Sequence, residues 1–424
     1  MNERMSRRTL LGAMAGVTGA SLTGSYMASA TPSTQVGRRD QASRWDVIVV
    51  GAGVFGAWTA WKLHHLGKKV LLVDAWGPAH DRASSGGESR LTRSEYGGDE
   101  LYTRMAWESL PDWQALSRQA GLPIFHPVGA LYLYQDEHAA IAASMELHRR
   151  LKIPMEKLSR AQLAVHYPQI GLHDIAVGVF QPTMGALMAR RAIQTLAAQF
   201  VASGGEYRQL AIKPPTGGAL LEGIDATDGH RLQASQYVFA CGPWLPKLFP
   251  DVVGSRIVPT RQDVFFFAPE AGDVRFQGQH LPAWVDPDHR NQHYGFPSLE
   301  QRGFKIALDR HGPRFDPDTG ARQITAEALA NVREYLAQRF PALARRPLSE
   351  SRVCQYENSA NGDFLIDRHP RWSNVVLMGG GSGHGFKHGP EVGRYASELI
   401  ANRLRNPEPR FALARHAPQD QPKA

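Results

Sequence analysis

The stretch from Trp45 to Asp74 constrains the fold of this chain more than any other part of the sequence. A run of β-branched residues over 47–50 predicts a strand that is buried on both faces. Gly51-Ala-Gly-Val-Phe-Gly56 follows directly, then an apolar helical run, then a second strand over 70–73 that ends at Asp74. Strand, glycine turn, helix, strand and acid in this order are typical of a dinucleotide-binding βαβ unit.

Each glycine of this turn has its own expected role. Gly51 permits the tight turn, Gly53 lets the backbone approach a pyrophosphate, and Gly56 lets the helix pack closely on the strand. The helix N-terminus then directs free N–H groups toward the phosphates. Asp74 is placed to accept hydrogen bonds from a ribose hydroxyl, which favours NAD or FAD over NADP. The alternative is an ordinary βαβ unit with glycine turns.

A second glycine-rich turn lies near the other end of the chain. A predicted strand over 374–378 runs into Gly379-Gly-Gly-Ser-Gly-His-Gly385, and a helix is predicted over 391–405. Five glycines within 379–385 are hard to explain by a tight turn alone. We expect backbone N–H groups of this loop, at Gly383 and Gly385, to hold the ring or ribityl part of a cofactor.

Residues 1–30 have the features of a twin-arginine signal peptide. They contain Ser6-Arg-Arg-Thr-Leu-Leu11, a weakly apolar stretch, and small residues at Ala28-Ser-Ala30. Residues 31–43 are expected to form a polar linker. The twin-arginine machinery carries folded proteins, which suits a chain that acquires its cofactor in the cytoplasm, so a periplasmic or secreted location is predicted. The alternative is a disordered basic N-terminus.

Composition narrows the class of partner. The chain has no apolar run of about 18 residues, so no stable membrane insertion is expected. Its net charge of +8 is scattered rather than gathered in a basic block, which disfavours nucleic-acid binding.

Acids and histidines over 286–293 suggest a metal site, but isolated loop residues of this kind are more often on the surface, so no metal is expected. A disulfide between Cys241 and Cys354 is disfavoured because Cys241 ends a predicted central strand.

Basic residues stand out at two places in the chain. Arg90 and Arg93 are three residues apart, so they would share one face of a helical turn. The pair would form either a solvated basic turn or a fork for a phosphate or carboxylate. Lys305 stands alone on a short apolar strand over 303–308. Each residue also has an ordinary alternative, a solvated lysine or a structural ion pair.

Together these motifs resemble the D-amino-acid-oxidase-type FAD superfamily, and within it the branch of monomeric sarcosine oxidase and N-methyltryptophan oxidase. The resemblance covers about residues 44–405. It implies an α/β fold of α+β two-domain type, in which a Rossmann-like FAD-binding domain is interleaved with a substrate domain built on a large mixed sheet. The implied FAD-binding domain comprises 44–124, 187–257 and 360–405, the substrate domain 125–186 and 258–359, and the C-terminal tail 406–424.

The resemblance also implies roles for individual residues. The cofactor-binding residues are Gly51, Gly53, Gly56, Asp74, Arg90, Cys354, Gly383 and Gly385, with Cys354 bonded to the flavin 8α-methyl group through sulfur. The residues expected to act on the substrate or on oxygen are Arg93, Tyr294, Lys305, Tyr356, His384 and Lys387. In relatives the residues that match Arg93 and Lys387 clamp the substrate carboxylate, and the one that matches Lys305 activates oxygen near flavin N5. Arg352 and the arginine pair are candidates for the positive field that the Cys354 thiolate needs.

The resemblance implies a monomeric, FAD-dependent oxidase of secondary amines, and the expected signal peptide adds export. Hydride passes from an N-alkylated or cyclic amino acid to flavin N5, the imine is hydrolysed, and molecular oxygen yields hydrogen peroxide. Two alternatives stay open: an FAD-dependent dehydrogenase that passes electrons to a quinone or carrier, and a flavin-binding protein without turnover. Lys305 favours the oxidase.

Two acids depart from the pattern of sarcosine-oxidising relatives. Asp309 stands four residues after Lys305, where those relatives carry a histidine, and Glu357 stands where relatives often carry a threonine. Two acids near the pocket would bind a second, cationic or hydroxylated part of the substrate. This puts sarcosine itself in doubt and leaves N-alkylated or cyclic amino acids as the expected class.

Overall fold

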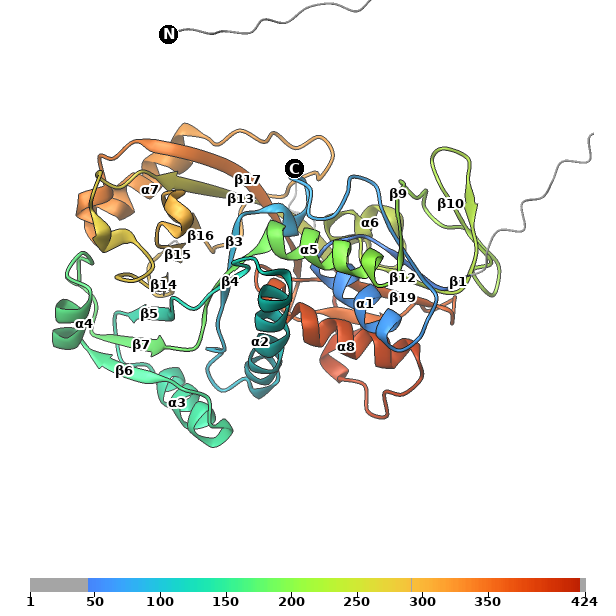
Figure 1. Ribbon diagram of the computed structural model, residues 1–424, viewed down its shortest axis with the longest axis horizontal. Coiled ribbons are helices and arrows are strands. Elements are labelled where there is room, and N and C mark those ends of the chain that lie inside the picture. The colour runs from blue at the N-terminus through green and yellow to red at the C-terminus, as the bar shows by residue number, and fades with distance from the viewer. Residues whose placement is uncertain (1–44, 291, 420–424) are drawn as a thin grey trace, which may run out of the picture. The chain divides into compact units, whose positions relative to one another are not determined.

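The computed structural model describes residues 45–290 and 292–419 (Figure 1). The expected signal peptide, 1–30, and linker, 31–43, lie outside the described residues, as do residues 420–424 of the expected tail. Within the described ranges, no helix combines the length and the apolar character needed to cross a bilayer.

The predicted βαβ unit forms the centre of a six-stranded sheet. β1 (Trp45–Val50), α1 (Val54–His65) and β2 (Val70–Asp74) occur in the expected order. β1 pairs in parallel with β2 on one side and with β12 (Ala234–Phe239) on the other. The full strand order is β18-β19-β12-β1-β2-β9, in which β9 spans Glu206–Gln209, β18 Leu365–Arg368 and β19 Val375–Gly379. This is the Rossmann-like arrangement that the sequence predicts.

Both faces of the six-stranded sheet are covered, which explains the uninterrupted apolar run of β1. Val47 and Val49 pack into one core cluster with side chains of α1 and α8 (Gly389–Ile400). Ile48 and Val50 point to the opposite face and pack against the segment 221–257. Figure 1 shows α1 and α8 side by side, and the two helices are in contact. Full burial of each valine or isoleucine contributes about 1.5–3 kcal/mol.

An eight-stranded mixed sheet forms the second large layer. Its order is β17-β13-β16-β15-β14-β5-β7-β6, and β14 and β5 form its parallel pair. The strands are β5 (Ala130–Tyr134), β6 (Glu156–Ser159), β7 (Val177–Gln181), β13 (Ile257–Phe267), β14 (Ala283–Asp286), β15 (His293–Phe296), β16 (Phe304–Leu308) and β17 (Leu348–Ser359). α7 (Ala326–Arg339) packs on one face of this sheet. The hydroxyl of Thr325 caps α7 by accepting the N–H of Ala328 at 3.1 Å.

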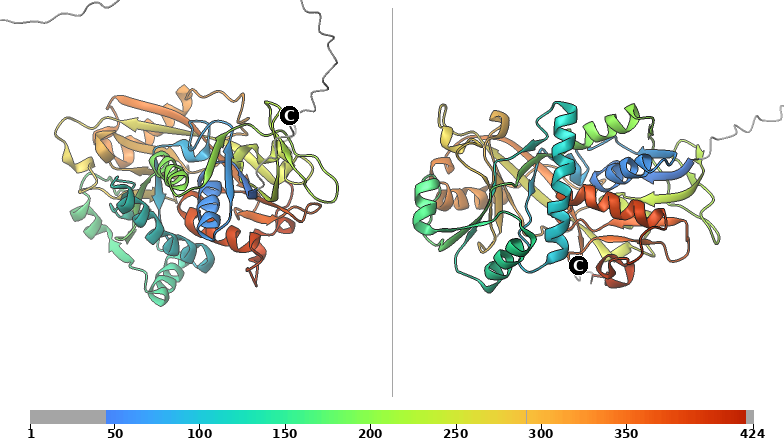
Figure 2. Two further views of the ribbon diagram at one scale, coloured as in Figure 1. Left: turned by 45° about the vertical axis from the view of Figure 1, so that its right-hand side comes forward. Right: turned by 60° about the horizontal axis from the view of Figure 1, so that its bottom comes forward.

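Smaller elements complete the fold. A three-stranded sheet, β3-β8-β4, is formed by β3 (Ser89–Thr92), β8 (Gly185–Met188) and β4 (Phe125–His126). The right-hand view of Figure 2 shows α2 (Glu100–Ala120) running between the two large sheets. The other α-helices and strands of the described residues are α3 (Ala139–Leu151), α4 (Arg160–His166), α5 (Ala189–Ala202), α6 (Leu245–Leu248), β10 (Ile224–Asp225) and β11 (Arg231–Leu232).

The expected fold class is confirmed. Strands of the six-stranded sheet come from 45–74, 206–239 and 365–379, and those of the eight-stranded sheet from 130–181 and 257–359, so the chain alternates between the two sheets. The domain boundaries given above stay a prediction.

One expected local structure is wrong. Arg90 lies in the strand β3, beside residues 185–188 of β8, rather than in a helical turn. The two segments pair with each other in an antiparallel ladder, and this long-range pairing outweighs the local helical pattern. Arg93 lies just beyond the end of this strand.

Candidate active site

The dinucleotide turn opens on a cavity of about 360 Å³. Gly51, Gly53 and Asp74 line one part of it, and Cys241 and Trp244 line another. The Asp74 carboxylate accepts the N–H of Ala52 at 2.7 Å and that of Trp76 at 2.8 Å. Backbone donors therefore hold this acid at the end of β2, on the wall of the cavity.

The three positions of the turn do not all require glycine for the same reason. A Cβ on Gly51 would lie 2.3 Å from the carbonyl oxygen of Ala240, and one on Gly56 would lie 1.9 Å from that of Gly51. The protein itself therefore requires both glycines. Around Gly53 the nearest heavy atom would be Ser85 Oγ at 3.5 Å, an ordinary contact distance. Gly53 faces the cavity. The close approach of a ligand therefore explains why glycine is needed at this position.

This difference predicts opposite outcomes for two alanine variants. We expect Gly53→Ala to melt at the temperature of the parent apoprotein but to bind FAD about tenfold or more weakly, because its methyl group occupies ligand space. Gly56→Ala is expected to lose about 1–3 kcal/mol of folding stability through its clash with backbone. Thermal melting of the apoproteins and titration with FAD measure both effects. Parent-like FAD affinity in folded Gly53→Ala would contradict the pyrophosphate role.

Three cavities adjoin one another and together outline a path for the cofactor. A small cavity of about 60 Å³ shares Val54 and Glu357 with the dinucleotide cavity. It shares Tyr356 and Gly383 with a third cavity of about 690 Å³, called here the substrate cavity. A narrow dinucleotide end joined to a wide end suits an elongated ligand with a ring at one terminus. The residues present therefore fit FAD.

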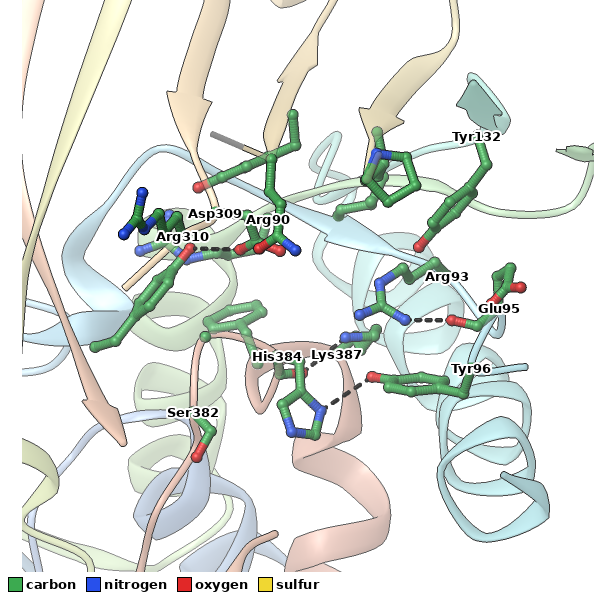
Figure 3. Close-up of a pocket in the computed structure, with 18 of the residues that line it drawn as sticks. Arg90, Arg93, Glu95, Tyr96, Tyr132, Asp309, Arg310, Ser382, His384 and Lys387 are labelled. Atoms are coloured by element: carbon green, nitrogen blue, oxygen red, sulfur yellow. Dashed lines mark hydrogen bonds between the residues drawn. The ribbon is translucent and has the colours of Figure 1, made fainter. Parts of the chain in front are cut away.

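Two cations meet on one side of the substrate cavity (Figure 3). The guanidinium carbon of Arg93 lies 4.1 Å from the ring centroid of Tyr96, and Lys387 Nζ lies 5.3 Å from the same centroid. Lys387 donates to the carbonyl oxygen of His384 at 2.7 Å, and Arg93 donates to that of Glu95. Burial and the neighbouring Arg93 lower the pKa of Lys387 well below its usual value. A buried lysine and a half-buried arginine on one side of the same cavity favour an anionic ligand, as the expected carboxylate clamp requires.

His384 is a neutral imidazole beside this pair. Its Nε2 lies 2.9 Å from the carbonyl oxygen of Gly362 and therefore donates, which leaves Nδ1 to accept the hydroxyl of Tyr96 at 3.1 Å. The same hydroxyl lies 2.8 Å from Nε2 of His388. Burial and the charge of Lys387 lower the pKa of His384 well below its usual value. His384 thus orients Tyr96 beneath the two cations without adding a third charge.

The opposite side of the substrate cavity carries a carboxylate (Figure 3). Asp309 follows β16, and its Oδ1 accepts the hydroxyl of Tyr356 at 3.1 Å. Tyr356 also bonds to the hydroxyl of Tyr294, and burial raises the pKa of Tyr294 to about 12. Both tyrosines are therefore neutral and orient hydroxyl groups at the cavity wall.

Lys305 lies in a neighbouring cavity of about 390 Å³ rather than in the substrate cavity. Its ammonium donates to the carbonyl oxygen of Ser89 at 2.7 Å and lies 4.7 Å from the ring centroid of Phe296, its cross-strand neighbour on β15. Lys305 is only 2% exposed, so it is not a solvated strand lysine. Burial and the charge of Arg90 lower its pKa well below the usual value. Arg90 lines both cavities and so marks where they adjoin.

Cys354 lines the same neighbouring cavity and is not bonded to Cys241. Arg90 Nη2 lies 3.2 Å from its sulfur and also donates to the carbonyl oxygen of Ser84 at 2.6 Å. Arg90 therefore places a cation directly against the thiol. Arg352, the other candidate for this field, instead pairs with Glu350 and Glu88.

Comparison with known proteins decides the family. The family model described as FAD dependent oxidoreductase (DAO) matches residues 46–399. The chain belongs to this family of FAD-dependent oxidoreductases. The monomeric sarcosine oxidase of Bacillus sp. (strain NS-129) is 31% identical over 365 residues, which are 84% of this chain and 93% of that protein. The expected superfamily and dependence on FAD are confirmed.

Two further relatives agree with the family and the fold. The N-methyl-L-tryptophan oxidase of Salmonella heidelberg (strain SL476) is 28% identical over 366 residues, 84% of this chain and 94% of that protein. The solved structure of L-proline dehydrogenase from P. horikoshii has a TM-score of 0.77 at 18% identity and covers 88% of this chain and 97% of its own. This structural likeness shows the shared fold of the family.

Most residues that the sequence singles out line the adjoining cavities of this oxidoreductase. The substrate cavity is lined by Arg90, Arg93, Tyr294, Tyr356, Gly383, His384 and Lys387, the neighbouring cavity by Lys305 and Cys354, the dinucleotide cavity by Gly51, Gly53 and Asp74, and the small cavity by Gly385. Gly56 lines none of them, because its role is to pack α1 on the turn. Among the described residues, no group of His, Cys, Asp or Glu has the arrangement of a metal site.

The expectation that two acids lie near the substrate is wrong for one of them. Asp309 lines the substrate cavity, but Glu357 lines the dinucleotide and small cavities. Glu357 directly follows Tyr356 in β17, and neighbouring residues of a strand point to opposite faces.

Aromatic residues of the site were missed by sequence reasoning. Tyr96, Tyr132 and Tyr134 line the substrate cavity. Tyr132 and Tyr134 are two residues apart on β5, so they share one face, and Tyr96 follows Arg93 by three residues. The spacing of the two strand tyrosines was the available signal, but no local pattern showed which face of the strand lines a cavity.

Proposed function

We propose that this chain is an exported oxidase that uses FAD to oxidise the C–N bond of an N-alkylated or cyclic amino acid. The pair of cations Arg93 and Lys387, in the cavity that adjoins the cofactor cavities, carries the proposal. Bound FAD would supply two-electron chemistry by accepting hydride at N5, with imine hydrolysis and peroxide formation completing the turnover. The similarity to sarcosine and N-methyl-L-tryptophan oxidases supports a secondary amine as the reacting group.

The residues of the substrate cavity would position the amino acid. Arg93 and Lys387 bind its carboxylate, and the hydroxyls of Tyr294 and Tyr356 line the space beside it. Asp309, on the opposite side, would accept a hydrogen bond from a cationic or hydroxylated side group. Sarcosine has no such group, and a cavity of about 690 Å³ accommodates a larger amino acid. We therefore propose a substrate larger than sarcosine.

A substrate screen tests this function. The purified protein is supplied with N-methyl, cyclic and glycated amino acids in air, and hydrogen peroxide is measured without an added acceptor. We expect most peroxide from amino acids with a cationic or hydroxylated side group, and none from matched amines without a carboxylate. Turnover only with an added quinone would favour the dehydrogenase. An absence of flavin reduction by every compound would favour a binding protein.

We also propose that FAD is bonded to this chain through Cys354, because Arg90 lies against the sulfur and stabilises negative charge there. After denaturation in acid, we expect flavin fluorescence to stay on the polypeptide of the parent protein and of a Cys241→Ala control. Cys354→Ala should release all of its flavin into the supernatant. Complete release from the parent protein would contradict the covalent bond.

Export rests on Arg7 and Arg8 and on the small residues before the expected cleavage site after Ala30. Replacing both arginines by lysine preserves the charge but removes the twin-arginine signature. We expect cell fractionation to move the protein from the periplasm to the cytoplasm in this variant, with an Arg4→Lys control still exported. An unchanged periplasmic fraction would contradict twin-arginine export.

A further inference from the structure

Glu357 is a carboxyl group on the cofactor path that the function proposed above does not use. It lies in β17 and lines both the dinucleotide cavity and the small cavity. Glycines surround its carboxyl group: a Cβ on Gly381 would lie 3.2 Å from Oε1, and Cβ atoms on Gly379 and Gly242 would lie 3.5 and 3.6 Å from Oε2. The end of β19 and the turn after β12 therefore approach this carboxyl group through glycines, with no side chain of their own between them and it.

The protein supplies hydrogen-bond partners for only part of the carboxyl group of Glu357. N–H groups of Gly380 and Gly381 donate to it. Its Oε2 is buried and has no hydrogen-bond partner among the described residues. An unpaired buried polar atom is destabilising, because it has lost its hydrogen bonds to water without replacing them. Such an atom on the wall of a ligand cavity indicates that the ligand supplies the missing partner.

The charges around Glu357 determine which form of the carboxyl group suits FAD. The titratable or charged residues that line the same two cavities are Asp74, His80, Arg90, Cys241, Lys247, Asp318 and Tyr356. Of the cations, Lys247 is paired with Asp318, and Arg90 donates to backbone carbonyls and to Cys354. Neither is left to neutralise both a carboxylate and the diphosphate of FAD. An ionised Glu357 would therefore repel the diphosphate.

We propose that Glu357 is a direct ligand of FAD that binds it as a neutral carboxylic acid, so that FAD binding takes up a proton above neutral pH. The neutral acid donates its O–H to a phosphate or ribityl oxygen through Oε2, while the other oxygen keeps the N–H groups of the glycine loop. No bond is made or broken other than the O–H bond formed with the proton from solvent.

The pH dependence of FAD binding follows from the ionisation of Glu357 in the protein without FAD. Burial raises the pKa of Glu357 to about 7, although the N–H groups of Gly381 and Gly380 act in the opposite direction. Below this pH the acid is already protonated, and FAD binds without proton uptake. Above it the acid must first be protonated, so the Kd for FAD rises about tenfold per pH unit. Affinity is thus complete below about pH 7 and is lost as the pH rises.

The test uses the full chain with Cys354→Ser, which allows FAD to be removed and rebound. Flavin fluorescence gives the Kd between about pH 6 and about pH 9, and calorimetry in phosphate and in Tris at about pH 8 gives the protons taken up. We expect a rising Kd above neutrality and about one proton per FAD. Adding Glu357→Gln should flatten the Kd and abolish the uptake, because the amide still donates to FAD and still accepts from the glycine loop.

Glu350→Gln is the matched control. Glu350 lies on the same strand but pairs with Arg302 and Arg352, outside both cofactor cavities. This variant should keep the pH slope and the proton uptake. A Kd independent of pH, proton release on binding, or an unchanged slope in Glu357→Gln would overturn the proposal. The calorimetric result on protein that retains Glu357 decides the matter even where Glu357→Gln fails to fold.

Discussion

Lys305→Met is expected to slow reaction of the reduced protein with oxygen by about 10²–10³-fold, the loss typical of one preorganised cationic or hydrogen-bond donor. Reduction of oxygen begins with a negatively charged species, and an ammonium beside it stabilises the transition state. Lys305 is 2% exposed and lies among aromatic rings, where water screens its charge little. Met preserves the length and apolar packing of the side chain, so the variant removes mainly the charge.

Stopped-flow measurement of the two half-reactions tests this role. Lys305 lines the neighbouring cavity and not the substrate cavity, so anaerobic reduction of Lys305→Met by substrate should keep about the parent rate. Mixing the reduced variant with oxygen should reveal the slow step. Reoxidation at the parent rate would contradict the oxygen role of Lys305 and favour the dehydrogenase alternative.

Arg93→Met is expected to weaken substrate binding by about 3 kcal/mol, roughly a hundredfold in Kd. The variant removes one of the two cations on the carboxylate side of the substrate cavity. The remaining Lys387 holds its proton less firmly than a free lysine because burial lowers its pKa, so it compensates poorly for the loss. Reoxidation by oxygen should be unaffected, because Arg93 does not line the cavity of Lys305.

The concentration dependence of anaerobic reduction gives the Kd for substrate in this variant. A competitive carboxylate inhibitor should lose affinity in parallel, whereas a matched amine without a carboxylate should bind both proteins equally weakly. Parent-like affinity for the amino acid would contradict the clamp. Opposite effects of Lys305→Met and Arg93→Met on the two half-reactions would separate the two cavities functionally.

Local sequence patterns were sufficient for the dinucleotide turn. A side chain on Gly51 or Gly56 would clash with backbone a few residues away or beside a neighbouring strand. Asp74 ends the strand that follows. Their positions depend on turn geometry and strand periodicity, which are properties of short segments. The same is true of the start of α7, where the hydroxyl of Thr325 caps the helix by accepting the N–H of Ala328, three residues away.

Pairing between distant segments decided the rest of the site. Arg90 lies in a strand because β3 pairs with β8, about a hundred residues away. No local sequence pattern predicts this pairing. Tyr96 enters the site because its ring contacts Arg93 and Lys387, which are separated by most of the chain.

The sequence by itself determined the family, the cofactor class and the identity of most side chains near the cofactor, because motif order along the chain is enough for these. Only the tertiary structure decided which cavity each side chain faces. It placed Lys305 apart from the carboxylate clamp, and it separated Asp309 from Glu357. The physical reason is that the direction of a strand side chain depends on register and on the neighbouring layer, which residues far away in the sequence provide.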